Sequence, residues 1–247
     1  MYFLYHELSF TPQAYTYVLH RDAFRDQLDL FQQPSQSKRI SAKLTFDDGH
    51  ISNYEIALPM LADRGMTADF FLTTSWIGKQ HGYMNWSQVR DLHTAGQRIG
   101  AHGWSHKLLT HCSPDELKLE LFDARKLLED ELGAPVTSLS FPGGRFNKRI
   151  LGVCLDAGYT SMFSSTPQLT KLPIGPLTGR LNVRGDWTFS YIQKLLDPEK
   201  NVLRSLERQD KLKGLAKKIL GDSLYGRIWS AANRESSNTD TPTDTRI

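Results

Sequence analysis

Cysteine is scarce in this 247-residue chain, which contains only Cys112 and Cys154. The two form no CxxC pair, and so the sequence excludes a disulfide framework and a cysteine-rich zinc site. We expect both to be small buried side chains. The chain also lacks a run of about 18 consecutive apolar residues, which is the length that a membrane-spanning helix needs.

A strong excess of charge of one sign is also missing. The formal net charge is +3, which is too small to indicate nucleic-acid binding. The first seven residues (MYFLYHE) do not show the basic segment and apolar core of a secretory signal. The sequence therefore predicts a cytoplasmic protein without a nucleic-acid partner, and it does not predict an oligomeric state.

Three regions differ in composition. We expect one folded domain over residues 1–197, a basic helical extension over 198–234 and a disordered polar tail over 235–247 (ESSNTDTPTDTRI). Within the extension, residues 212–229 (LKGLAKKILGDSLYGRIW) are typical of a basic amphipathic helix. Such a helix either packs on the domain with a solvated basic face or makes peripheral contact with an anionic membrane.

Short β-rich runs and helical patterns alternate in the first region. The patterns predict strands over 40–46, 67–74, 98–102, 136–141 and 159–164, and helices over 53–64, 87–96, 114–132 and 148–157. Alternation of this kind indicates a parallel α/β sheet or barrel. The active site of such a fold lies at the carboxyl ends of the strands.

Two histidines four residues apart, His102 and His106, are candidate metal ligands. On a helical turn, side chains at i and i+4 share a face and can bind one ion. Neutral imidazole suits zinc, iron, cobalt or nickel. Taken alone, an HxxxH pair is a weak signal, and polar or capping roles stay open.

Two adjacent carboxylates, Asp47 and Asp48, follow the strand expected over 40–46. Adjacent side chains point in different directions, so one could bind a metal while the other faces substrate. The alternative for the pair alone is a turn closed by Gly49.

Together, the two carboxylates and the two histidines indicate a hydrolytic metal site, which neither pair indicates alone. One aspartate and two histidines form a mixed nitrogen and oxygen set that leaves metal positions open for water and substrate. A second aspartate can then deprotonate that water. The proline and glycines at 142–144 would expose backbone N–H groups where an oxyanion develops. These groups predict hydrolysis of an amide or an ester.

Over residues 40–165 the sequence resembles the polysaccharide deacetylases of carbohydrate esterase family 4, which contain the NodB homology domain. Residues 45–49 (TFDDG) are similar to the first motif of that family, and residues 102–106 (HGWSH) are similar to the second. The family normally has Ser or Thr at the position of Gly103. Three further stretches, at 57–61, 68–71 and 99–102, occur in the order of the family.

This resemblance implies a distorted (β/α) barrel of about seven repeats. It implies that Asp47 is the catalytic base and that Asp48, His102 and His106 bind a divalent metal ion, Zn²⁺ first, with Co²⁺ or Ni²⁺ as alternatives. The substrate that it implies is an N-acetylated sugar polymer or oligosaccharide, which would lose acetate and keep a free amine. We expect a role in exopolysaccharide synthesis.

Two parts of the family pattern are absent. Ser140 stands where the third motif often has an arginine that orients the catalytic aspartate. We expect Arg180 to supply that charge, with Arg145 and Arg184 or a mere surface role for Arg180 as alternatives. The backbone N–H of Gly143 is the expected oxyanion donor. No histidine follows His111, and so the late histidine that serves the family as general acid is missing.

Other residues and other functions stay open at this stage. His6, which precedes Glu7, is similar to a histidine often seen near the start of bacterial relatives; we expect a structural role for it, with an approach to the site as the alternative. Among the aromatic residues that could stack on sugars (Trp76, Tyr83, Trp86 and Trp104), we place Trp104 first. The alternatives to a sugar deacetylase are a hydrolase of another small amide and a catalytically degenerate glycan-binding protein.

Overall fold

The computed structural model describes residues 1–11, 16–33, 41–167, 176–209 and 212. The expected tail and nearly all of the expected basic helix at 212–229 lie outside these residues. The chain divides into two units, Met1–Leu203 and Arg204–Ile247. Among the described residues, no helix has the length and apolar character needed to cross a membrane. The two cysteines are free and buried.

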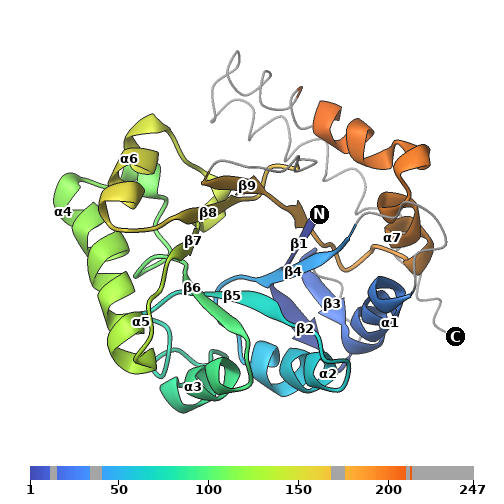
Figure 1. Ribbon diagram of the computed structural model, residues 1–247, viewed down its shortest axis with the longest axis horizontal. Coiled ribbons are helices and arrows are strands. Elements are labelled where there is room, and N and C mark those ends of the chain that lie inside the picture. Colours follow the sequence, from blue (N-terminus) through green and yellow to red (C-terminus); the bar gives the residue numbers. More distant parts are fainter. Residues whose placement is uncertain (12–15, 34–40, 168–175, 210–211, 213–247) are drawn as a thin grey trace, which may run out of the picture. The chain divides into compact units, whose positions relative to one another are not determined.

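A parallel sheet of eight strands forms the centre of the first unit (Figure 1). Its spatial order is β10-β1-β4-β5-β6-β7-β8-β9. The strands are β1 (Tyr2–Tyr5), β4 (Lys43–Phe46), β5 (Ala68–Leu72), β6 (Arg98–Ala101), β7 (Ser138–Ser140), β8 (Ser161–Ser164), β9 (Leu177–Gly179) and β10 (Leu181–Asn182).

One short stretch of chain joins the two ends of this sheet. β9 pairs with β8, β10 pairs with β1, and only Arg180 separates β9 from β10. The sheet therefore curves into a nearly closed barrel in which β9 and β10 share one strand position, so that eight strands occupy seven positions. The distorted (β/α) barrel that the resemblance implied is confirmed.

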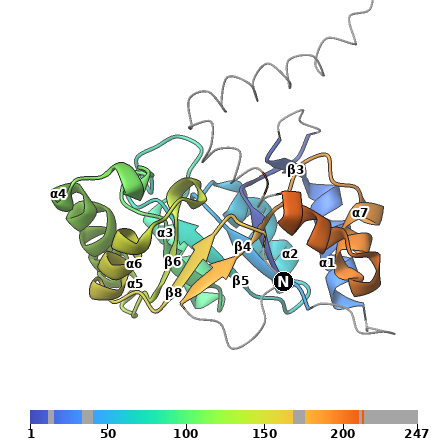
Figure 2. The same cartoon turned by 90° about the horizontal axis from the view of Figure 1, so that it is seen from above.

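Helices cover the outside of the barrel (Figure 1). They are α1 (Arg21–Gln32), α2 (Leu58–Ala62), α3 (Trp86–Thr94), α4 (Pro114–Leu117), α5 (Ala124–Leu132), α6 (Lys148–Asp156) and α7 (Phe189–Leu196). A π-helical turn, Asn53–Ala57, leads into α2, and a longer π-helical stretch, Lys118–Asp123, joins α4 to α5. Seen from above, α4, α5 and α6 lie on one side, and α1 and α7 lie side by side on the other (Figure 2).

Capping residues explain where several helices begin and end. The side chains of Ser113 and Glu116 form the expected capping box at α4. α3 begins slightly earlier than the sequence suggested, because the side chain of Asn85, rather than Ser87, caps it together with Gln88. Left-handed Gly133 ends α5.

The first 33 residues contain elements that the sequence patterns did not reveal. β1 occupies the barrel between β10 and β4, and its Phe3, Leu4 and Tyr5 are almost completely buried. β2 (Glu7–Ser9) and β3 (Val18–His20) form a separate parallel pair before α1. A strand buried on both faces is uniformly apolar, which removes the alternation that identifies half-buried strands.

Candidate active site and metal centre

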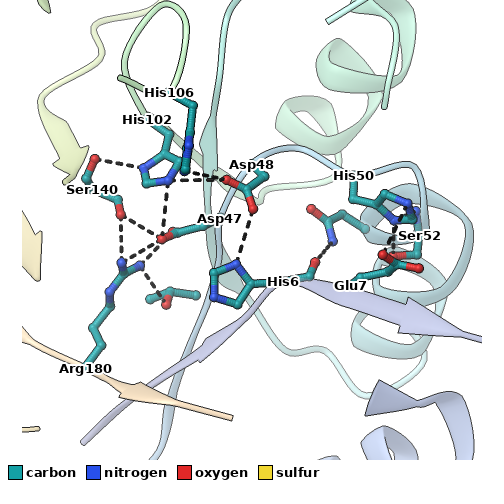
Figure 3. A network of polar contacts seen from close by, with 12 residues as sticks. His6, Glu7, Asp47, Asp48, His50, Ser52, His102, His106, Ser140 and Arg180 are labelled. Carbon is teal, nitrogen blue, oxygen red and sulfur yellow. Dashed lines mark hydrogen bonds and ion pairs between the residues drawn. The ribbon is translucent and has the colours of Figure 1, made fainter. Parts of the chain in front are cut away.

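Polar side chains gather where the strands of the barrel end (Figure 3). Asp47 and Asp48 directly follow β4, His102 follows β6, and Ser140 ends β7. Arg180 lies at the break between β9 and β10. Because all these strands are parallel, their carboxyl ends meet at one rim of the barrel and bring together side chains that are up to 133 residues apart.

Three of these groups form a possible metal site. Ligand atoms of Asp48, His102 and His106 all lie within 4.8 Å of one another. Oδ1 of Asp48 is 3.3 Å from Nε2 of His102 and 3.4 Å from Nε2 of His106. This oxygen is buried and has no hydrogen-bond partner among the described residues. A buried carboxylate oxygen normally has a partner. A cation among the three atoms would supply it, so the residues fit a divalent ion.

The hydrogen bond of His102 and the charge states of Asp48 and His106 support that arrangement. His102 is buried, and its Nδ1 donates to the backbone oxygen of Ser140 at 2.9 Å, which directs Nε2 toward Asp48. At His102 burial is outweighed by the carboxylates of Asp47 and Asp48, which raise its pKa, and a bound cation would oppose that shift. Burial favours the neutral acid at Asp48, but the neighbouring imidazoles of His102 and His6 outweigh it and lower the pKa of Asp48. Burial and the neighbouring His102 lower the pKa of His106. An ionised carboxylate beside a neutral His106 suits metal binding.

The two histidines do not lie on a helix, which corrects the interpretation of their spacing. Residues 102–106 form a loop after β6. Gly103 and His106 both have left-handed backbone conformations, with φ of 79° and 62°. Asp48 is also left-handed, with φ of 76°. Such values are rare outside glycine and concentrate at functional sites. The histidine rings therefore converge through turns of the loop rather than through helical periodicity.

Asp47 lies beside the possible metal site and is held on both carboxylate oxygens. Arg180 donates from Nη1 to Oδ1 and from Nη2 to Oδ2, both at 2.8 Å. Oγ of Ser140 donates to Oδ2 of Asp47 at 2.8 Å and accepts from Nη2 of Arg180 at 2.7 Å. All three residues are at most 2% exposed. Burial favours the neutral acid at Asp47, but the charge of Arg180 outweighs it and lowers the pKa of Asp47.

The other predicted residues occupy different places. Arg184 is exposed and pairs with Asp186, and Arg145 is exposed as well. Of the three candidate arginines, Arg180 is thus the one that contacts Asp47 in the structure. Gly143 follows β7 with φ of 62°, and a Cβ there would lie 2.7 Å from Leu108 in the loop after His106. The role of its N–H as an oxyanion donor stays a prediction.

Two further residues, His6 and Trp76, lie close to the possible metal ligands. Nδ1 of His6 lies 3.3 Å from Oδ2 of Asp48 (Figure 3). His6 directly follows β1, so recognition of that strand would have placed it at the same rim. The ring of Trp76 lies 5.3 Å from that of His106 and 4.7 Å from that of Tyr83. Trp76, rather than Trp104, therefore contributes the aromatic ring that contacts a possible metal ligand.

Known proteins share both sequence and fold with this chain. The sequence model of the family described as "Polysaccharide deacetylase" matches residues 35–162, which is more than half of the chain. The chain belongs to the polysaccharide deacetylase family. It is similar to YxkH of Bacillus subtilis, a protein whose name describes a polysaccharide deacetylase, with 31% identity over 54% of this chain and 48% of YxkH.

Other relatives of this chain match either a part of its sequence or its fold. The peptidoglycan-N-acetylglucosamine deacetylase PgdA of Listeria monocytogenes is 31% identical over 46% of this chain and 23% of PgdA. The chain thus spans about half of YxkH and a quarter of PgdA. The deacetylase PplD of Streptococcus pyogenes, solved with acetate, superposes with a TM-score of 0.70 and 18% identity over 80% of this chain and 97% of PplD. IcaB of Ammonifex degensii superposes with a TM-score of 0.65 and 20% identity over 78% of this chain and 97% of IcaB. The last two show the shared fold.

Proposed function

We propose that this chain is a divalent-metal-dependent deacetylase that removes N-acetyl groups from a polymer or oligosaccharide of the N-acetylglucosamine type. The observation that carries the proposal is the buried Oδ1 of Asp48, which lacks a hydrogen-bond partner among the described residues and faces Nε2 of both His102 and His106. Membership of the family and the activities for which YxkH and PgdA are named support the substrate class.

Asp48, His102 and His106 would hold the ion, with Zn²⁺ as the first candidate and Co²⁺ or Ni²⁺ as alternatives. When bound, a divalent ion there supplies Lewis acidity toward a water molecule and an amide carbonyl. Asp47 is the proposed base that takes the proton from the attacking water. Its ionised state at neutral pH follows from the lowered pKa that Arg180 maintains.

Arg180 and Ser140 act on the proposed base rather than on the substrate. Their hydrogen bonds to both oxygens of Asp47 prevent rotation of the carboxylate. A fixed base does not have to be ordered during the reaction, which is the advantage of positioned catalytic groups. Since no histidine follows His111, we propose that Asp47 passes the proton it has taken to the leaving nitrogen. One carboxylate then serves both proton transfers.

An aromatic surface beside the site supports a sugar substrate. Trp76 and Tyr83 are partly exposed, their rings contact each other, and Trp76 contacts His106. Exposed faces of aromatic rings offer apolar area to the apolar faces of sugars. We propose that this pair contacts the sugar ring next to the reacting N-acetyl group, and that Gly143 donates its N–H to the developing oxyanion from the neighbouring loop.

Acetate release tests the proposal. The purified chain is stripped of metal with a chelator, and Zn²⁺, Co²⁺ or Ni²⁺ is added back separately. Acetate is then measured with N-acetylglucosamine polymers of different linkage, with peptidoglycan and with small non-sugar acetamides. We expect release from a sugar polymer only when a metal is present.

Each other result has a distinct meaning. Release from the small acetamides alone would support a hydrolase of another amide. Glycan binding without acetate from any substrate and metal would support a degenerate binding protein. The predicted role in exopolysaccharide synthesis requires that a free N-acetylglucosamine polymer is a better substrate than peptidoglycan.

A further inference from the structure

Glu120 is a buried carboxylate outside the residues that the proposed reaction uses. It is 1% exposed and lies in the π-helical stretch Lys118–Asp123 between α4 and α5. Its Oε2 accepts from the backbone N–H of Trp104 at 2.8 Å and of Ser105 at 3.0 Å. Its Oε1 accepts from the hydroxyl of Ser105. In the described part of the chain no ion pair to Glu120 is present.

All three donors lie between the two histidines of the possible metal site. Trp104 and Ser105 lie in neither a helix nor a strand, so their N–H groups have no partner from a regular element of their own. Burial of a carboxylate is costly unless hydrogen bonds replace its hydration. Charge-assisted bonds from two N–H groups and a hydroxyl offset that cost. The buried carboxylate of Glu120 thus ties residues 104 and 105 to the π-helical stretch through three hydrogen bonds. A glutamate on the surface would be hydrated by water and would not need these bonds.

Gly103 shows how tightly the two segments fit. A Cβ at this position would lie 2.8 Å from Oε2 of Glu120, which is too close for a real contact. The carboxylate therefore occupies the space that a larger residue at 103 would need. The absence of a side chain at 103 and the buried carboxylate at 120 are two parts of one arrangement.

We propose that Glu120 is a positioning residue for the metal centre. It holds the loop in the conformation in which left-handed His106 directs Nε2 to within 3.4 Å of Oδ1 of Asp48. Glu120 touches neither metal nor substrate and acts through the backbone of Trp104 and Ser105. The proposal rests on the proposed metal site, and it adds a requirement that the three ligands alone do not contain.

The neighbouring helix α5 offers a matched control. Its Glu129 accepts from the backbone N–H of Val136 at 2.9 Å and from Nε of Arg125 at 3.0 Å. It thus also ties a loop to a helix, but in a loop that carries no proposed ligand. Removal of Glu129 costs the hydrogen bonds from Val136 and Arg125, and removal of Glu120 costs the three from Trp104 and Ser105. Only Glu120 is expected to affect the metal.

The test compares Glu120→Ala, Glu120→Gln, Ser105→Ala and Glu129→Ala in the full chain. Zn²⁺ affinity is measured by competition with a chromophoric chelator, and amide hydrogen exchange at Trp104 and Ser105 is measured in the metal-free protein. We expect Glu120→Ala to weaken Zn²⁺ binding by about 10- to 100-fold, as is typical for residues that orient metal ligands, and to speed exchange at both amides.

The other variants sharpen the result. Glu120→Gln is expected to retain most of the affinity, because its amide oxygen can accept both N–H bonds and its NH₂ can donate to the Ser105 hydroxyl. Ser105→Ala, which removes one donor, should lose a smaller factor and serves if Glu120→Ala does not fold. Glu129→Ala should bind Zn²⁺ like the wild type.

Two outcomes overturn the role of Glu120: a folded Glu120→Ala protein that binds Zn²⁺ as tightly as the wild type, or an equal loss in Glu129→Ala. A wild-type chain that binds no divalent metal would instead overturn the proposed function. In that case unchanged exchange at Trp104 and Ser105 in Glu120→Ala would separately overturn the proposed hold on the loop.

Discussion

The two halves of the site are built differently. Asp47, Ser140 and Arg180 are held at the ends or breaks of strands, and each is at most 2% exposed. The possible metal ligands Asp48 and His106 lie in left-handed loop positions, with side chains 22% and 35% exposed. Groups on strands are positioned by the sheet itself, whereas groups on loops need additional support. The base is therefore fixed by the barrel, as is His102, which is 2% exposed and directly follows β6. The other two metal ligands depend on neighbours, and for His106 we propose that this neighbour is Glu120.

The largest expected effect comes from a change in the metal half of the site, which consists of Asp48, His102 and His106. Asp48→Ala removes the oxygen that faces both histidines, so we expect loss of bound metal and loss of acetate release to the background rate. Metal content after dialysis and acetate assays with added Zn²⁺ check this. Full metal occupancy in this variant would show that the ion binds elsewhere.

Asp47→Asn tests the proposed base separately from the proposed metal ligands. The amide cannot act as a base, but Asp47 is not one of the proposed ligands, so we expect metal binding to remain while kcat falls by about 10²- to 10⁴-fold. Metal titration and kcat should be measured on the same preparation. Full activity with normal metal content would exclude Asp47 as the base.

The same contrast explains what the sequence could predict. Asp47-Asp48 and the HxxxH pair are short contiguous patterns, and the strand and helix patterns placed them at one rim of the barrel. The start of α4 and the end of α5 were predictable because Ser113, Glu116 and Gly133 have local capping roles. These features depend on neighbours in the chain, which is why single-sequence reasoning finds them.

The remaining features depend on contacts distant in sequence. Arg180 could be preferred among three candidate arginines but not placed, because closure of the barrel through β9 and β10 is what brings it to Asp47. The helical interpretation of the HxxxH pair failed because left-handed Gly103 and His106 shape a loop. Glu120 had no signal, since a glutamate among charged helical residues normally indicates a solvated face.

Arg180→Met tests the strand-held half. The substitution leaves Asp47 buried without its cationic partner, and breaking a buried pair in this way costs about 3–5 kcal/mol. We therefore expect a lower free energy of unfolding in denaturant titrations of the metal-free protein. In an Asp47→Asn background the same substitution should cost less, because no buried charge remains. Equal costs in both backgrounds would show that the pair contributes little beyond packing.

Ser140→Ala is the smallest change in the same half and measures how far the sheet alone fixes the base. The hydroxyl donates to Oδ2 of Asp47 and accepts from Nη2 of Arg180. Its loss leaves the bidentate pair intact, so we expect a cost of about 1 kcal/mol in stability and a roughly fivefold lower kcat at most. Denaturant titration and kcat at saturating substrate measure the two effects. If kcat fell about 100-fold with metal retained, the hydroxyl would be needed in the reaction itself, and the strand-held half could no longer be regarded as a rigid support for Asp47 alone.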